Sequence, residues 1–191
     1  MSHTTQHRPS RALGAALMLA LLAPAGAAAQ QSATAPPARE ADVASLDAIM
    51  AAVYDVISGP KGEKRDWDRF YSLFAPGARL IPTGRTPEGQ TRARVMTPQE
   101  YVQASGPYLE GEGFFEREAF RVTEQFGSIA HVFSTYESRR TEADPAPFMR
   151  GINSFQLMND GQRWWIVTIY WQAERPDTPI PVRYLPPGGT R

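Results

Sequence analysis

The stretch Phe148–Glu174, FMRGINSFQLMNDGQRWWIVTIYWQAE, contains two runs rich in aromatic and β-branched residues. The four residues Asn159-Asp160-Gly161-Gln162 separate the two runs. An Asp-Gly pair between alternating hydrophobic residues is typical of a β-hairpin, because glycine accepts the positive φ that a type I′ turn requires. The stretch therefore predicts a long antiparallel hairpin that turns at Asp160-Gly161.

A second pair of alternating runs lies directly upstream. Phe114–Phe126 and Ile129–Thr141 flank Gly127-Ser128, and a glycine in first place suits a type II′ turn. Glu142–Pro147 forms the connection to the later hairpin. The second half of the chain thus predicts four long antiparallel strands.

The first half of the chain has the pattern of helices. Asp42 can cap a first helix that ends at Gly59-Pro60, and its apolar positions recur every three or four residues. They are Val43, Leu46, Met50, Val53 and Ile57. Asp66 begins a shorter helix with Trp67, Phe70, Tyr71 and Phe74 on one side, and Pro76-Gly77 ends it.

A third helix begins at Thr97-Pro98-Gln99-Glu100, which is a capping box with proline in the first helical position. Gly106-Pro107 is expected to kink or end this helix. Before it, Ala78–Pro82 predicts a short strand, and the Gly/Pro-rich segment Thr83–Thr91 predicts a loop. Helices followed by long antiparallel strands indicate an α+β fold.

Three motifs carry a resemblance to a known family. They are W-x-x-F-Y-x-x-F from Trp67, R-L-I-P from Arg79, and G-x-N-S-F-Q-L…D-G-x-R-W-W-I-V-x-I-Y-W from Gly151. Together they resemble the nuclear transport factor 2-like superfamily, and its SnoaL-like branch in particular. The resemblance implies a cystatin-like fold, in which a cone-shaped, curved antiparallel sheet wraps around about three N-terminal helices and encloses a pocket. It also implies frequent dimers, and activities that range from isomerases, dehydratases and hydrolases to binders without catalysis.

The N-terminus has the features of a secretory signal peptide. Arg8 and Arg11 precede the apolar run Ala12–Ala23, and Ala27-Ala28-Ala29 offers a cleavage site before Gln30. The apolar run is too short to span a membrane, so a periplasmic or secreted protein is expected. The predicted organisation is a signal peptide (1–29), a disordered linker (30–40), an α+β domain (41–175) and a Pro-rich C-terminal arm (176–191).

Composition excludes several kinds of site. The chain has no cysteine, so disulfides, thiol catalysis and cysteine-ligated metals are excluded. After cleavage His131 is the sole histidine, so a multi-histidine metal site is excluded and we expect neither metal nor cofactor. The 20 Lys and Arg residues balance 20 Asp and Glu, and cleavage leaves a slightly acidic chain. We therefore expect no nucleic-acid partner and no membrane partner after cleavage.

A two-residue turn at Asp160-Gly161 assigns the later hairpin two faces. We expect the inner, cone-lining face to hold the pairs Leu157/Trp164, Phe155/Ile166, Asn153/Thr168 and Gly151/Tyr170. The outer face then carries Trp165, Ile169 and Trp171, with Arg150 over Trp171 as a cation–π pair. A homodimer through the Trp165/Trp171 face would cover these side chains.

The turn at Gly127-Ser128 likewise assigns faces to the earlier hairpin. The face that carries Phe120, Val122, Phe126 and His131 is the more apolar, so it is expected to point inward. This places Glu124 beside His131, where a carboxylate would orient the imidazole as a general acid or base. The alternative is a buried histidine that one carboxylate satisfies, or a glutamate that reaches solvent.

Glu118 opposite Glu137 is a second candidate pair, because two close carboxylates push one pKa upward. The alternative is neutralisation by neighbouring arginines, namely Arg117, Arg139 and Arg140. Tyr54 on the first helix could direct a phenol into the pocket, as the tyrosine of the ketosteroid isomerase oxyanion hole does. No matching aspartate pair accompanies Tyr54, so that apparatus is not carried over, and the alternative for Tyr54 is an aromatic residue at the edge of the core.

The sequence leaves three functions open. In the first, the cone binds a small, mostly apolar or aromatic molecule; the predicted ligand-binding residues are Tyr54, Phe120, Phe133, Asn153, Thr168 and Tyr170. In the second, His131 and Glu124 catalyse a cofactor-free isomerisation, dehydration or hydrolysis. In the third, the outer sheet face is a protein–protein interaction module.

Overall fold

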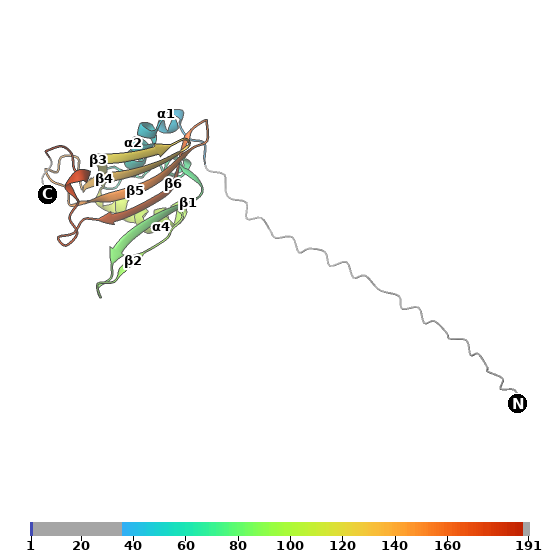
Figure 1. Cartoon of the computed structure of the whole chain (residues 1–191). Coiled ribbons are helices and arrows are strands. Elements are labelled where there is room, and N and C mark those ends of the chain that lie inside the picture. The colour runs from blue at the N-terminus through green and yellow to red at the C-terminus, as the bar shows by residue number, and fades with distance from the viewer. Residues whose placement is uncertain (2–35, 189–191) are drawn as a thin grey trace. The chain divides into compact units, whose positions relative to one another are not determined.

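A six-stranded sheet and the helices that cover one of its faces make up the described part of the chain (Figure 1). The structure, a computed structural model, describes Met1 and residues 36–188, so the predicted signal peptide lies outside the described residues apart from Met1. The helices are α1 (Glu40–Val43), α2 (Leu46–Ile57), α3 (Trp67–Ser72), α4 (Pro98–Glu112) and the 3₁₀ helix η1 (Val182–Tyr184). The strands are β1 (Phe74–Arg85), β2 (Thr91–Ala93), β3 (Phe115–Phe126), β4 (Ile129–Arg139), β5 (Met149–Asn159) and β6 (Trp164–Ala173).

The sheet has the strand order β2-β1-β6-β5-β4-β3. The two predicted hairpins form β3–β4 and β5–β6, and both are antiparallel. β1 pairs with β6 in parallel, with Leu80 beside Ile169, so the expectation of a purely antiparallel sheet is wrong at this point. β1 is also longer than the predicted strand Ala78–Pro82, because its end pairs with β2 across the segment expected to be a loop.

Caps and packing set the helix boundaries. The cap of α2 is Ser45, whose hydroxyl accepts from the Ala48 N–H at 3.0 Å, whereas the predicted cap Asp42 binds Arg69 instead. The capping box of Thr97 and Glu100 starts α4 as predicted. This helix then continues through Pro107 to Glu112, where a break was expected.

The β5–β6 register departs from the prediction. Asn159 pairs with Trp164 across a four-residue turn, where Asp160 accepts the N–H groups of Gln162 and Arg163. A further shift after Leu157 leaves one extra residue in β6. From that point the side chains of β6 exchange faces, because neighbouring residues of a strand point to opposite sides.

The β3–β4 hairpin contains a second shift. Phe126 pairs with Ile129 as predicted, but the register changes between Glu118 and Phe120. Every second side chain of β4 is buried, namely Ala130, Val132, Ser134, Tyr136 and Ser138; Thr135, on the opposite face, is buried as well. The face expected to point outward therefore packs against the helices, and the face with His131 points away from them.

The C-terminal arm covers part of the outer sheet face. Ile180 and Leu185 are buried, and the Thr135 hydroxyl donates to the Tyr184 carbonyl at 2.5 Å. The rings of Tyr184 and Phe133 lie 4.8 Å apart. No helix within residues 36–188 has both the length and the apolar character needed to cross a membrane.

Candidate functional site

A cavity of about 200 Å³ lies between α2, α4 and the inner sheet face. Its apolar wall is built from Val53, Ile57, Phe70, Leu80, Leu109, Phe114, Met149, Phe155, Ile169 and Trp171. Ser105 and Tyr108 line it from α4, and Tyr108 is also exposed at the protein surface. The cavity is therefore accessible beside α4.

The polar part of the wall gathers around Glu116, the second residue of β3. Its carboxyl group accepts from the Ser138 hydroxyl at 2.9 Å and from the Asn153 amide at 3.4 Å. Burial raises the pKa of Glu116 to about 7, although both hydrogen bonds favour the ionised form. This carboxyl group therefore exchanges its proton near neutral pH.

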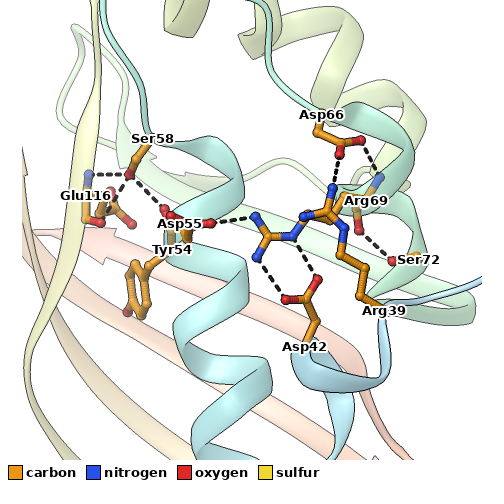
Figure 2. A network of polar contacts seen from close by, with 9 residues as sticks. All are labelled: Arg39, Asp42, Tyr54, Asp55, Ser58, Asp66, Arg69, Ser72 and Glu116. Carbon is orange, nitrogen blue, oxygen red and sulfur yellow. Dashed lines mark hydrogen bonds and ion pairs between the residues drawn. The ribbon is translucent and has the colours of Figure 1, made fainter.

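Local hydrogen bonds fix Tyr54 and Glu116 next to each other. The Ser58 hydroxyl, at the end of α2, donates to the Tyr54 carbonyl at 2.7 Å and accepts from the Glu116 N–H at 2.9 Å (Figure 2). A helix end and a strand start thus share one serine, which satisfies backbone groups that the helix itself leaves unpaired. Ser58 holds the end of α2 against β3.

The Tyr54 hydroxyl belongs to a chain of buried polar groups. It lies 2.7 Å from the Ser134 hydroxyl and accepts from the Asn153 amide at 3.1 Å. Ser134 in turn donates to the Glu118 carboxylate at 2.6 Å. Burial raises the pKa of Tyr54, so its phenol stays protonated.

Glu118 lies between the buried Ser134 and a polar groove that α2 and β3 form. Arg121 lies 3.4 Å from the Glu118 carboxylate and also pairs with Asp47 of α2. The groove has a volume of about 580 Å³, and both Tyr54 and Glu116 contribute to its wall. The same two side chains thus border the apolar cavity and the polar groove.

Two further phenols complete the cavity. Tyr101 of α4 and Tyr136 of β4 line it together with Glu116. Burial, and then the nearby charge of Glu116, raises the pKa of each phenol. The Tyr101 ring stacks on Phe70 at 5.6 Å and meets the edge of Trp171 at 6.1 Å, so packing fixes its position.

This arrangement can bind a small apolar molecule by one polar group and can move a proton at the Glu116 carboxyl. A general acid or base works best when its pKa is close to the working pH. Among residues 36–188, no cluster of three or more His, Cys, Asp or Glu side chains could hold a metal ion.

Two of the predicted ligand-binding residues, Tyr54 and Asn153, lie at this cavity. The other four do not: Phe120, Phe133, Thr168 and Tyr170 lie on the outer face. For Thr168 and Tyr170 the reason is the extra residue in β6, which exchanges the faces of the residues beyond it. Phe120 and Phe133 keep the predicted pairing, but the face of the hairpin that carries them is the outer one. Their predicted place in the pocket is therefore wrong.

The predicted catalytic pair also lies on the outer face. His131 Nδ1 is 3.6 Å from the Glu124 carboxylate, and His131 Nε2 is 3.1 Å from the Ser154 hydroxyl. The side chains of His131 and Glu124 are 38% and 80% exposed, so water competes for these contacts. The expectation that His131 faces the cavity is wrong, and a catalytic role for the pair stays a prediction.

Three other predicted contacts differ from the structure. Glu118 faces inward, whereas Glu137 faces outward and binds Arg117 and Arg139, so the two carboxylates form no pair. Arg150 pairs with Glu174 rather than with Trp171. Ile169 and Trp171 point inward, whereas Trp165 points outward as predicted; Arg163 stacks on it at 3.6 Å.

Several site residues were not among the sequence candidates for the pocket, namely Glu116, Ser134, Tyr136, Ser138 and Trp171. One signal was present in the sequence of β4. Positions 130, 132, 134, 136 and 138 carry no charge, whereas His131, Glu137 and Arg139 alternate with them. The face of β4 without any charged residue was therefore a better indicator of the buried face than the number of aromatic residues.

Comparison with known proteins supports the fold. No family model matches this sequence, and no curated protein matches it either. A protein of unknown function with a cystatin-like fold from Nostoc punctiforme superposes with a TM-score of 0.50 at 12% identity, over 66% of this chain and 86% of that one. A nuclear transport factor 2-like protein of unknown function from Silicibacter pomeroyi gives a TM-score of 0.45 at 14% identity, over 69% of this chain and 94% of that one.

The predicted fold class is therefore confirmed: the chain has a cystatin-like α+β fold. At these identities the likeness concerns the fold alone. The SnoaL-like branch and the export of the chain stay predictions.

Proposed function

We propose that this protein binds a small, mostly apolar molecule in the cavity and that Glu116 is the main polar contact of that molecule. The observation that carries the proposal is the composition of the wall, which is mostly apolar and aromatic and holds one cluster of buried polar groups around Glu116. Ligand sites typically combine an apolar wall with a few convergent polar groups. Tyr54 and Asn153 flank Glu116 in this cluster.

The volume of the cavity limits the size of the ligand. An engineered apolar cavity of about 150 Å³ in another protein binds benzene. A cavity of about 200 Å³ suits a single ring with a short polar substituent. Export of the chain would place this binding activity in the periplasm or outside the cell.

Thermal shift with a panel of ring-sized molecules tests the proposal. We expect at least one class to raise the Tm, and we expect Ser105→Phe to abolish the shift because the new ring would occupy the cavity. Ala104→Phe is the matched control, since Ala104 is exposed on the same helix and does not line the cavity. An unchanged shift in Ser105→Phe would contradict binding in the cavity.

Proton transfer at Glu116 is a second candidate function. The observation that favours it is the pKa of Glu116, which burial raises to about 7. Molecules found to bind are incubated with the protein and followed by NMR for conversion. We expect any turnover to disappear in Glu116→Gln and to persist in His131→Ala, and the opposite pattern would move the chemistry to the outer face.

A further inference from the structure

The buried hydrogen bonds around Tyr54 have a fixed direction. The Ser134 hydroxyl donates to the Glu118 carboxylate at 2.6 Å. A serine hydroxyl carries one proton, so in the 2.7 Å contact between Ser134 and Tyr54 the donor must be Tyr54. The proton of the Tyr54 phenol therefore points at Ser134 and away from the cavity.

The other hydrogen-bond donors next to Tyr54 also have acceptors within the protein. The Asn153 amide has two protons; one goes to the Tyr54 oxygen at 3.1 Å and one toward the Glu116 carboxyl at 3.4 Å. The proton of Ser138 also goes to Glu116, at 2.9 Å. At this point of the wall a ligand meets a lone pair of Tyr54 and the carboxyl oxygens of Glu116, and these groups accept hydrogen bonds.

The Ser134–Glu118 pair is held firmly on the far side of Tyr54. Ser134 is fully buried, and Arg121 lies 3.4 Å from the Glu118 carboxylate. Neither Ser134 nor Glu118 lines the cavity. These two residues can influence a ligand through Tyr54 without touching it.

The other phenols of the wall do not discriminate in the same way. Tyr101, Tyr108 and Tyr136 line the cavity together with Ser105, and a hydroxyl group can donate or accept as the ligand requires. The part of the wall formed by Glu116 and Tyr54 therefore distinguishes ligands that donate a hydrogen bond from ligands that only accept one. An acceptor on the ligand, such as a ketone oxygen, would meet other acceptors there.

We propose that the cavity selects apolar molecules that bring a hydrogen-bond donor, a hydroxyl or an amine, and that Ser134 and Glu118 are positioning residues that impose this choice through Tyr54. The inference rests on the proposed function and adds the chemical class of the ligand. Buried groups that lose their hydrogen-bond partner discriminate strongly between ligands that differ by one polar group. Aromatic walls formed by Tyr101 and Trp171 also suit a cationic amine.

A matched pair of probes tests the selection. 1-Phenylethanol and acetophenone have nearly the same shape and differ by two hydrogen atoms, one of which is the hydroxyl donor. Their Kd values are measured by tryptophan fluorescence, since Trp171 lines the cavity, and are checked by calorimetry. Because the pKa of Glu116 is about 7, pH 8 keeps this group mostly ionised. We expect the alcohol to bind at least tenfold more tightly than the ketone.

Two variants test the positioning role. In Ser134→Ala the Tyr54 proton loses its acceptor and can turn toward the cavity, so we expect the alcohol preference to fall to twofold or less. Glu118→Ala releases the proton of Ser134 to Tyr54 and should act in the same direction. Glu118 is 24% exposed, so this variant keeps the test available if Ser134→Ala does not fold. Ser72→Ala is the control, because Ser72 is equally buried and its hydroxyl donates to the Arg69 carbonyl.

The outcomes separate the two proposals. A ketone that binds as tightly as the alcohol to the wild-type protein would overturn the inference and leave the proposed function standing. A preference that survives in both Ser134→Ala and Glu118→Ala would overturn the positioning role. If neither probe binds at its solubility limit, the cavity is no site for ring-sized polar molecules, and the proposed function falls with the inference.

Discussion

The buried carboxyl group of Glu116 makes stability depend on pH. Its pKa is about 7 in the folded protein against an ordinary value of 4.5, and burial is the main cause. The unfolded chain therefore releases this proton first as pH rises. The stability that the neutral group contributes is complete below pH 4.5 and is lost as pH rises through 7, which amounts to about 3 kcal/mol.

Replacing Glu116 by glutamine should remove this dependence. We expect Glu116→Gln to raise the free energy of unfolding at pH 8 by about 1–3 kcal/mol and to change it little at pH 4. Urea unfolding of both proteins at the two pH values measures the effect. Glu124→Gln is the control, because the Glu124 side chain is 80% exposed. A variant less stable than the wild type at pH 8 would contradict the argument.

Gly151 shows how closely the inner face of the sheet packs. A Cβ atom at this position would lie 2.5 Å from the Tyr136 hydroxyl and would also meet the backbone carbonyl of Gln172. The backbone oxygen cannot move without breaking the sheet, so we expect Gly151→Ala to cost about 2–4 kcal/mol. Gly84→Ala, where the added Cβ meets open space, should change the Tm little. Thermal unfolding of the two variants compares them directly.

At the scale of the elements, Arg69 joins three helices. From α3 it binds the Asp42 carboxylate of α1 at 2.7 Å and the Asp55 carboxylate of α2 at 2.5 Å (Figure 2). The hydrogen bond from Arg69 lowers the pKa of Asp42, and both side chains are largely buried. Arg39 and Asp66 form a comparable pair that is exposed to solvent.

The two pairs should differ in what they contribute to stability. We expect Arg69→Met to lower the free energy of unfolding by about 3 kcal/mol at pH 7, because it leaves Asp42 charged, buried and unpaired. Arg39→Met should cost less than about 0.5 kcal/mol. The effect of Arg69→Met should shrink as pH falls below the ordinary pKa of Asp42, since the depressed pKa gives stability only above that range. Urea unfolding at pH 7 and pH 3 checks both statements.

The elements also show what the sequence could predict. Hairpins, turns and the capping box follow from local chemistry, and Gly127, Thr97 and Glu100 act as expected. A β-bulge has no comparable local signature, because one extra residue changes neither the composition nor the alternation near the turn. The shift between Gln156 and Leu157 therefore places Trp171 in the cavity and Tyr170 outside it, and the shift between Glu118 and Phe120 turns Glu118 inward while Phe120 points outward.

Only part of the site could be predicted from the sequence. Tyr54 and Asn153 lie at positions that the shifts do not affect, and both are buried at the cavity. Glu116 lies beyond the shift in β3, so it points inward although Phe120 and Glu124, on the same face by simple alternation, point outward. His131 was placed inward because its face carries more aromatic residues, and the C-terminal arm and solvent share that face instead.

At the scale of the whole molecule, the outer sheet face leaves many apolar side chains exposed. Those exposed on β3, β4, β5 and β6 are Val122, Phe126, Ile129, Met158, Val167 and Tyr170. Monomeric proteins rarely leave such a contiguous surface uncovered. Trp165 lies beside Met158 on this face, so this part of the predicted dimer surface is present in the structure. Trp171, the other tryptophan of the predicted surface, points inward.

We therefore propose a homodimer through the face formed by Ile129, Met158 and Trp165. A two-fold axis brings the same apolar patch of both copies together, so one substitution acts twice in the interface. We expect light scattering to give twice the monomer mass, and we expect Met158→Glu to give the monomer, because two carboxylates would be buried without partners. Val95→Glu is the control, since Val95 is 61% exposed and lies outside β3–β6. A wild-type monomer at all concentrations, or a dimer that survives Met158→Glu, would contradict this arrangement.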